Sequence, residues 1–259
     1  MYYSQTELYV SVLGSNFDLK FARKSKDDMV LLSDGKSIPS MRSFTIALFV
    51  RVDSRIQSGT LFSYSVPQQS QDIIVLSFTE SEILLEIKDK VIKTSFRLLD
   101  DRWHYVGVVW NGITGDTFVY VDGPEREHSK DVNTGSIIMG GGWIVLGQRY
   151  LADGQNPTES TAFLGTLHQV SLWDVPASAD HMWNAAHNCT WPIAGSVRAW
   201  SSFLLGIKGE VEKRFMTQCK GMQSAKHSKF ARDAFVHKAL DPEAKIGRAS
   251  CRERVCQYV

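Results

Sequence analysis

Short apolar runs separated by turn-forming residues dominate the chain from residue 29 to residue 173. Many of them alternate apolar and polar positions, and they recur at the spacing of about 8–12 residues that is typical of β-sandwiches. The expected strands are 29–32, 44–50, 59–64, 73–78, 83–87, 91–94, 103–110, 120–123, 144–148 and 163–173. Strands this short bury their apolar faces by packing sheet on sheet, so the pattern predicts an all-β fold of two antiparallel sheets.

One short helix is expected within this all-β pattern. Ser178 is a good N-cap for a helix over residues 179–186, in which Met182, Trp183 and Ala186 share one face at helical spacing. Residues 197–200 and 207–211 then return the chain to the sheets.

Length and charge exclude several classes of function. A chain of 259 residues can bury one large core, and its net charge of +1 gives no reason to expect nucleic acid as a partner. No apolar run approaches the roughly 20 residues needed to span a bilayer. The first residues lack the basic start and apolar core of a signal peptide, so we expect that a secreted form carries a further N-terminal segment.

The chain divides into four expected segments. Residues 1–16 are a lead, 17–213 the sandwich, 214–245 a basic linker or the start of a following domain, and 246–259 a non-native tail. The tail is set apart because residues 246–255 resemble a translated sequencing adapter. Without Cys251 and Cys256, the cysteines left are Cys189 and Cys219, which allow a single disulfide; two free thiols are the alternative. Asn188 begins an N-glycosylation sequon.

Several short motifs keep one order along the sandwich. They are Phe62-Ser63-Tyr64, Tyr120-Val121-Asp122-Gly123, Leu146-Gly147-Gln148 and Leu172-Trp173-Asp174. In order and spacing the chain resembles the pentraxin domain, a jelly roll of the laminin-G and concanavalin-like type, over roughly residues 17 to 213. Gly140-Gly141-Gly142 looks most like the pentraxin module of large multidomain extracellular proteins with sushi, von Willebrand factor and EGF domains. The resemblance implies an extracellular protein with neighbouring domains, and Cys219 could belong to the junction with the next one.

The resemblance also implies a calcium site and a disulfide between the sheets, and the chain departs from both. The family's calcium positions fall on Ser70, Gln71, Arg149, Tyr150, Leu151, Thr158 and Thr161, none of which is a carboxylate. Calcium prefers six to eight oxygen ligands with several carboxylates, so we expect no metal here; a register slip onto Asp72, Asp153 and Glu159 is the alternative. The disulfide positions hold Ala47 and Gly107.

Other candidate sites have structural interpretations that the sequence favours. Glu82 and Glu86 share a strand face, as the carboxylates of glycoside hydrolases do, but Leu84 stands between them. The histidines at 104 and 168 have no nucleophile motif nearby, and those at 181 and 187 lack a zinc-ligand spacing. Trp143 and Trp191 lie outside the expected core, so any ligand-stacking site is expected at these two positions.

The function expected from these patterns is a non-enzymatic extracellular recognition or adhesion module of a larger secreted or cell-surface protein, with a degenerate calcium site and a protein or glycan ligand. A calcium-dependent, lectin-like binder of phosphocholine, phosphoethanolamine or carbohydrate is the first alternative. A glycoside hydrolase that uses Glu82 and Glu86 is the second.

Overall fold

The structure is a computed structural model that describes residues 17–34, 38–150, 157–188 and 195–215, with the backbone alone at residues 70–72. The strands in this part of the chain are β1 Phe17–Phe21, β2 Met29–Leu32, β3 Ser43–Val52, β4 Gly59–Val66, β5 Gln69–Phe78, β6 Glu82–Ile87, β7 Lys90–Ser95, β8 Trp103–Asn111, β9 Asp116–Val121, β10 Glu125–Ser129, β11 Trp143–Leu146, β12 Gly165–Trp173, β13 Ile207–Lys208 and β14 Glu212–Phe215. The helical elements are η2 Glu159–Thr161, α2 Ala179–His187 and η3 Trp200–Gly206.

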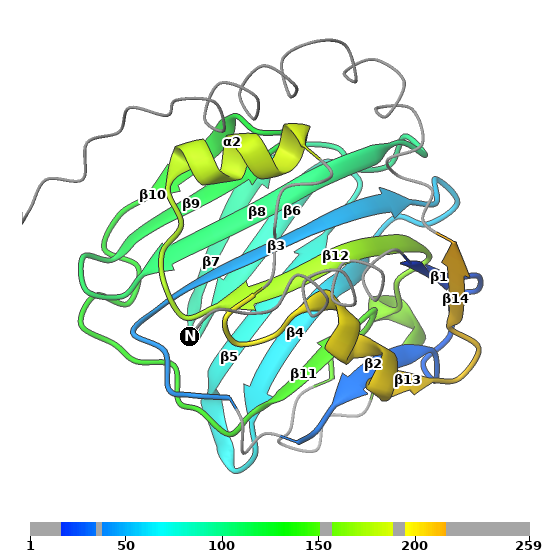
Figure 1. Ribbon diagram of the computed structural model, residues 1–259, viewed down its shortest axis with the longest axis horizontal. Coiled ribbons are helices and arrows are strands. Elements are labelled where there is room, and N and C mark those ends of the chain that lie inside the picture. The colour runs from blue at the N-terminus through cyan, green and yellow to red at the C-terminus, as the bar shows by residue number, and fades with distance from the viewer. Residues whose placement is uncertain (1–16, 35–37, 151–156, 189–194, 216–259) are drawn as a thin grey trace, which may run out of the picture. The chain divides into compact units, whose positions relative to one another are not determined.

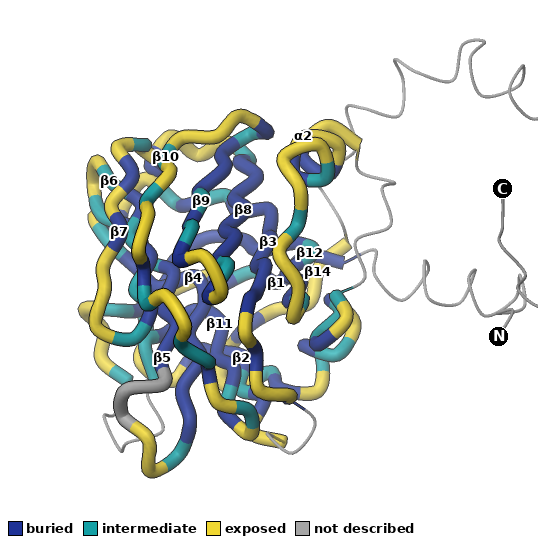
Figure 2. Tube along the Cα trace, turned by 90° about the vertical axis from the view of Figure 1, so that its left-hand side faces the viewer, coloured by how far each residue is buried: buried dark blue, intermediate teal, exposed yellow. Residues whose placement is uncertain are grey.

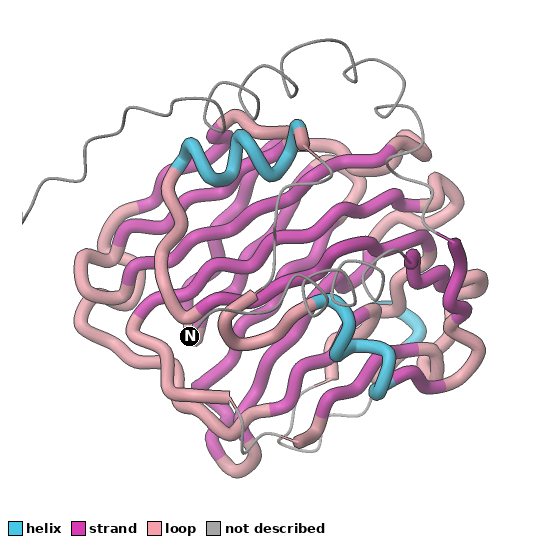
Figure 3. Tube along the Cα trace, viewed as in Figure 1, coloured by secondary structure: helices cyan, strands magenta, loops and turns pink. Residues whose placement is uncertain are grey.

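Two antiparallel sheets stack face to face, so the predicted two-sheet sandwich is confirmed (Figure 1). Within the described ranges each sheet has seven strands. The first sheet has the order β10-β9-β8-β3-β12-β1-β14, and the second has the order β13-β2-β11-β4-β5-β6-β7. Strands far outnumber helical elements (Figure 3).

The core lies between the two sheets. Buried positions run along the strands while exposed ones gather in the connecting turns (Figure 2). In β6 the burial alternates residue by residue, so that Ile83, Leu85 and Ile87 face the core and Glu82 and Glu86 face outward. The largest fully buried side chain is Trp110, whose indole N–H donates to Val132 O at 2.8 Å. In β6 the period of two in the sequence therefore specifies which face is buried.

Helix α2 covers part of the outer face of the first sheet and begins as predicted. Ser178 is its N-cap and accepts a hydrogen bond from His181 N at 3.2 Å. The predicted face was partly wrong, because Met182, Ala185 and Ala186 are buried while the Trp183 side chain is 51% exposed. Trp183 instead stacks on the ring of His187, with centroids 4.3 Å apart.

The two small residues at the expected disulfide positions lie within one sheet. Ala47 on β3 pairs directly with Gly107 on β8, so a bridge here would join neighbouring strands and not the two sheets, which corrects the sequence-based expectation. A Cβ at Gly107 would approach Met182 Sδ to 2.6 Å. The side chain of Met182 therefore occupies the space beside this pair, and α2 packs over it.

Some elements differ from the prediction. Strands β1, β10 and β14 were not predicted, and neither was the 3₁₀ helix η3, which lies between the two segments expected to return to the sheets. Before η3, Arg198 forms an isolated bridge to Leu172, and after it β13 pairs with β2. Strand β14 runs to Phe215 and pairs with β1 at the edge of the first sheet.

Candidate functional site

Of the positions that match the family's calcium ligands, the structure describes the side chains of Arg149, Tyr150, Thr158 and Thr161, which follow strand β11. The chain leaves β11 through Gly147, whose φ of +83° is a conformation that favours glycine and where a Cβ would overlap the ring of Phe21. The next residue, Gln148, is fully buried. Its side chain donates to Ser25 O at 3.0 Å and accepts from Thr161 Oγ1 at 2.8 Å. These bonds join the segment that follows β11 to the loop at Ser25 and to η2, immediately before Arg149.

Arg149 forms a two-pronged ion pair with Glu86 on β6. Arg149 Nη1 lies 2.5 Å from Glu86 Oε2, and Nη2 lies 3.1 Å from Oε1. The two side chains are 31% and 23% exposed, so water screens the pair only in part. Glu86 is the outward-facing residue opposite Val75 and Val91, so the guanidinium is held against the face of the sheet.

The remaining described positions of the predicted calcium set offer hydroxyls and aromatic rings. Tyr150 contacts Trp143, with ring centroids 5.9 Å apart and planes tilted by 58°. The hydroxyls of Thr158 and Thr161 lie 3.3 Å apart, and Thr158 Oγ1 lies 2.8 Å from Ser160 Oγ. Glu159 lies beside them in η2 and is exposed. No cluster of three or more His, Cys, Asp or Glu side chains suited to a metal occurs among the described residues.

Several predicted site residues lie outside the described residues. They are Leu151, Asp153, Cys189, Trp191 and Cys219, together with the side chains of Ser70, Gln71 and Asp72. The disulfide and part of both the calcium and the stacking predictions therefore stay predictions. Asn188 is described and exposed, as the C-cap of α2, with its backbone N–H bonded to Asn184 O.

Glu82 and Glu86 are not arranged as the acid and the nucleophile of a glycoside hydrolase. Glu82 and Glu86 do share the outer face of β6, with Leu84 between them. Glu86, however, has both carboxylate oxygens bound by Arg149. A guanidinium so placed occupies both carboxylate oxygens and obstructs the approach of a substrate to them.

A histidine bound between two carboxylates stands at the start of β8; the sequence favoured a structural role for His104 but did not indicate these two partners. His104 Nδ1 lies 2.8 Å from Asp122 Oδ2, and Nε2 lies 3.1 Å from Asp100 Oδ1. Burial alone lowers the pKa of His104, but the hydrogen bonds to the two aspartates outweigh it and raise the pKa above its usual value. The pKa of Asp122 is lowered, because hydrogen bonds from His104 and from Tyr105 N outweigh its burial. The cluster joins β8 to the two neighbouring turns.

His168 has a structural setting, in agreement with its sequence interpretation. It is fully buried, with Nδ1 2.8 Å from Phe17 O and 3.1 Å from Asp18 Oδ1. Trp200 Nε1 donates to the same carbonyl at 3.0 Å. These contacts bind β12 and η3 to β1.

Comparisons with known proteins agree with this architecture. The profile of the pentaxin family matches residues 18–214. Mouse neuronal pentraxin receptor is 32% identical over 191 residues, which cover 73% of this chain and 38% of the receptor. Human neuronal pentraxin-1 is 28% identical over 80% of this chain and 48% of its own length. The mouse sushi, von Willebrand factor type A, EGF and pentraxin domain-containing protein 1 is 29% identical over 82% of this chain and 6% of that protein.

A solved structure shows the same fold. The heptameric SAP-like pentraxin of Limulus polyphemus superposes with a TM-score of 0.68 at 19% identity, over 80% of this chain and 98% of that chain. The chain thus spans nearly all of one solved pentraxin, but less than half the length of the three curated relatives named above.

Proposed function

Because this chain belongs to the pentaxin family, we propose that it is a non-catalytic recognition or adhesion module that binds its ligand without calcium. We further propose that the protein lies outside the cell and forms part of a longer polypeptide. Its proposed ligand is an extracellular protein or glycan. The partial coverage of the curated relatives supports the longer polypeptide. Within the described residues, no helix is both long enough and apolar enough to cross a membrane.

The main support for ligand binding without calcium is the ion pair between Arg149 and Glu86. Calcium needs several anionic oxygens around one point, and the described positions of the family's ligand set supply a guanidinium, a phenol ring and two hydroxyls. Glu86 lies close by, but its two oxygens are bound to Arg149. A divalent cation placed here would be repelled by the guanidinium. The described residues at these positions therefore do not fit the metal.

Calcium titration into the full chain tests the proposal. After treatment with EDTA and dialysis, we expect no saturable heat by calorimetry, while a calcium-binding pentraxin in the same buffer serves as the positive control. Binding tighter than about 1 mM, the weak end of extracellular calcium modules, would contradict the proposal. It would favour the alternative in which Asp72, Asp153 and Glu159 rebuild a site.

Thermal melting gives a second readout of the same question. A site with a dissociation constant of about 1 mM would stabilise the fold by about 1.4 kcal/mol in 10 mM calcium. For a domain of this size that corresponds to a rise in Tm of roughly 3–6 °C. We expect the same Tm in calcium and in EDTA, to within about 1 °C.

The non-catalytic part of the proposal has its own test. The wild type and a Glu86→Gln variant are incubated with fluorogenic β- and α-glycosides. We expect no turnover from either, because Arg149 holds the carboxylate of Glu86. Hydrolysis by the wild type that is lost in Glu86→Gln would instead favour a glycoside hydrolase.

A further inference from the structure

A row of polar side chains crosses the outer face of the first sheet beside the part covered by α2. Lys20 on β1 pairs with Thr166 on β12, Thr166 pairs with Arg51 on β3, and Arg51 pairs with Trp103 on β8. Residues directly opposite each other on antiparallel strands point to the same side of a sheet. Lys20 and Arg51 are therefore neighbours across Thr166, about two strand spacings apart, or roughly 9–10 Å.

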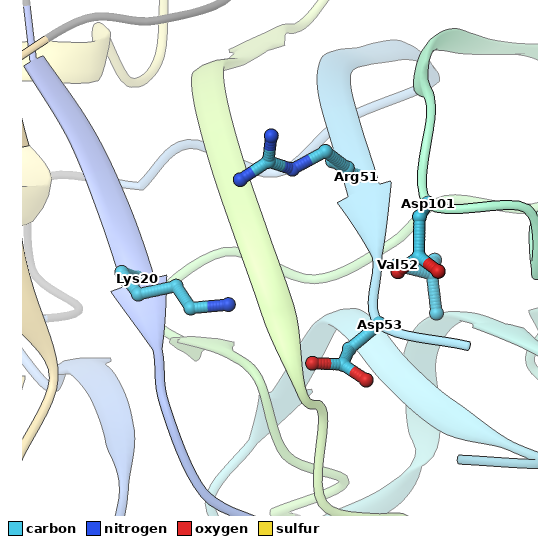
Figure 4. Close-up of a pocket in the computed structure, with 5 residues that line it drawn as sticks. All are labelled: Lys20, Arg51, Val52, Asp53 and Asp101. Atoms are coloured by element: carbon cyan, nitrogen blue, oxygen red, sulfur yellow. The ribbon is translucent and has the colours of Figure 1, made fainter. Parts of the chain in front are cut away.

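The two cations of this row have no ion-pair partner in the described part of the chain. Among the described residues, no carboxylate oxygen lies within 4.0 Å of the Lys20 ammonium or of the Arg51 guanidinium. Arg51 lies over the indole of Trp103, 5.6 Å from the ring centroid, which holds its side chain in place. Figure 4 shows the ends of Lys20 and Arg51 directed toward each other, across the strand between them.

The carboxylates near these cations have partners of their own. Lys20 and Arg51 line a pocket of about 280 Å³ together with Val52, Asp53 and Asp101. Asp53 is bound by Arg55, with Nε 2.7 Å from Oδ1 and Nη2 2.6 Å from Oδ2. Asp101 accepts from Ser54 N at 3.1 Å and from Ser54 Oγ at 2.6 Å. The positive charges of Lys20 and Arg51 are the ones left without a bound counter-charge.

Two further observations indicate that this place suits an anion. Thr166 is 3% exposed, and its hydroxyl Oγ1 is buried without a hydrogen-bond partner. The pKa of Lys20 is lowered, first by burial and then, against the opposing effect of Asp53, by the nearby guanidinium groups of Arg51, Arg214 and Arg55. A buried hydroxyl without a partner and crowded cations are both unfavourable arrangements that a bound anion relieves.

We propose that Lys20, Arg51 and Thr166 form a binding site for a tetrahedral oxyanion, a sulfate or phosphate group, either free or as an ester on a larger ligand. The planar guanidinium can donate two parallel hydrogen bonds to such a group, the ammonium adds a point charge, and the hydroxyl adds a third donor. This site lies on the first sheet, whereas Arg149 lies on the second. A result for or against calcium binding near Arg149 therefore neither supports nor contradicts the proposed anion site.

The first test is an NMR titration of the full chain with sodium sulfate and, separately, sodium phosphate, at ionic strength held constant with sodium chloride. We expect saturable shifts of the Arg51 Nε–H signal and of the amide signals around residue 166. Sodium acetate is the comparison, because its carboxylate is planar. Acetate binding as tight as sulfate and phosphate binding, or the absence of saturable shifts with both tetrahedral ions, would overturn the proposal.

Substitutions test whether the anion binds at Lys20, Arg51 and Thr166. Arg51→Gln and Lys20→Gln should each weaken binding about tenfold or more, since each removes a charge-assisted hydrogen bond. The matched control is Arg214→Gln, on the neighbouring β14, because Arg214 is already paired with Glu212. The control should change the affinity less than threefold. Equal losses in all three variants would mean non-specific attraction and would overturn the site.

Thr166→Val keeps the proposal testable if a charge substitution disturbs folding. The change preserves shape and removes a hydroxyl that has no partner, so the fold should be at least as stable, as urea unfolding can verify. We expect weaker sulfate and phosphate binding in this variant. Unchanged affinity would show that the hydroxyl does not contact the anion and would refute the three-residue site.

Discussion

The ion pair between Arg149 and Glu86 provides a quantitative test of how this sheet face is held together. Replacing Arg149 by Met keeps the length of the side chain and removes its charge, and replacing Glu86 by Gln keeps its shape. Two unit charges about 4 Å apart interact with about 4 kcal/mol at an effective dielectric constant of 20, whereas fully exposed pairs contribute about 0.2–1 kcal/mol. With side chains 31% and 23% exposed and two parallel contacts, we expect a coupling energy of about 1–2 kcal/mol.

The assay is a double-mutant cycle by urea unfolding, with the wild type, both single variants and the double variant. The pair between Arg214 and Glu212 is the internal control, because it has the same chemistry on side chains that are 52% and 47% exposed. Its coupling energy should stay below about 0.5 kcal/mol. A coupling between Arg149 and Glu86 no larger than that of the control pair would refute the view that Arg149 organises this face.

Three further predictions concern the supports of the fold. Gly147→Ala should destabilise by about 3 kcal/mol or more in urea unfolding, since it combines a positive φ with overlap on Phe21; a loss below 1 kcal/mol would contradict this. Because the pKa of His104 is raised in the folded state, its contribution to stability is complete below its unfolded pKa of about 6.5 and is lost as pH rises through the folded pKa. Urea unfolding from pH 6 to pH 9 or so should therefore show a loss of stability that His104→Gln lacks, and parallel profiles would argue against it. Met182→Ala should cost about 2–4 kcal/mol and Trp183→Ala less than about 1 kcal/mol, and the reverse order in thermal melts would mean that the helix face is misassigned.

The strands that the sequence revealed are those with at least one apolar face. β2, β6 and β8 were predicted almost to the residue, because their burial alternates or is continuous. β10 was missed because its sequence, Glu-Arg-Glu-His-Ser, is polar on both faces and lies at a sheet edge. A strand that buries few side chains has no alternation of apolar and polar residues by which it could be predicted.

Helical spacing alone also left the face of α2 ambiguous. Residues 182, 183 and 186 fit a helical stripe as well as residues 182, 185 and 186 do. The choice is made by the small pair Ala47 and Gly107 underneath, which admits Met182. That pair is formed by strands far apart in the sequence, so no local pattern could reveal it.

The same limit applies to the candidate sites. The sequence placed Arg149 at a calcium position of the family and Glu86 on the outer face of a strand, but nothing in it paired these two residues, which are 63 positions apart. The row from Lys20 to Trp103 depends on the register of four strands and carries no motif. Groups of residues like these can be identified only when the pairing of the strands is known.

The pairing of the first and last described strands determines how the domain responds to mechanical tension. Phe17 lies opposite Phe215, and Lys20 lies opposite Glu212. A force pulling on the backbone at Phe17 and Phe215 therefore acts at one end of this antiparallel pair, perpendicular to the strands. Its hydrogen bonds then break one after another, as a zipper opens, and do not share the load as they would in shear. We therefore expect strand β14 to separate first when force is applied at these two ends.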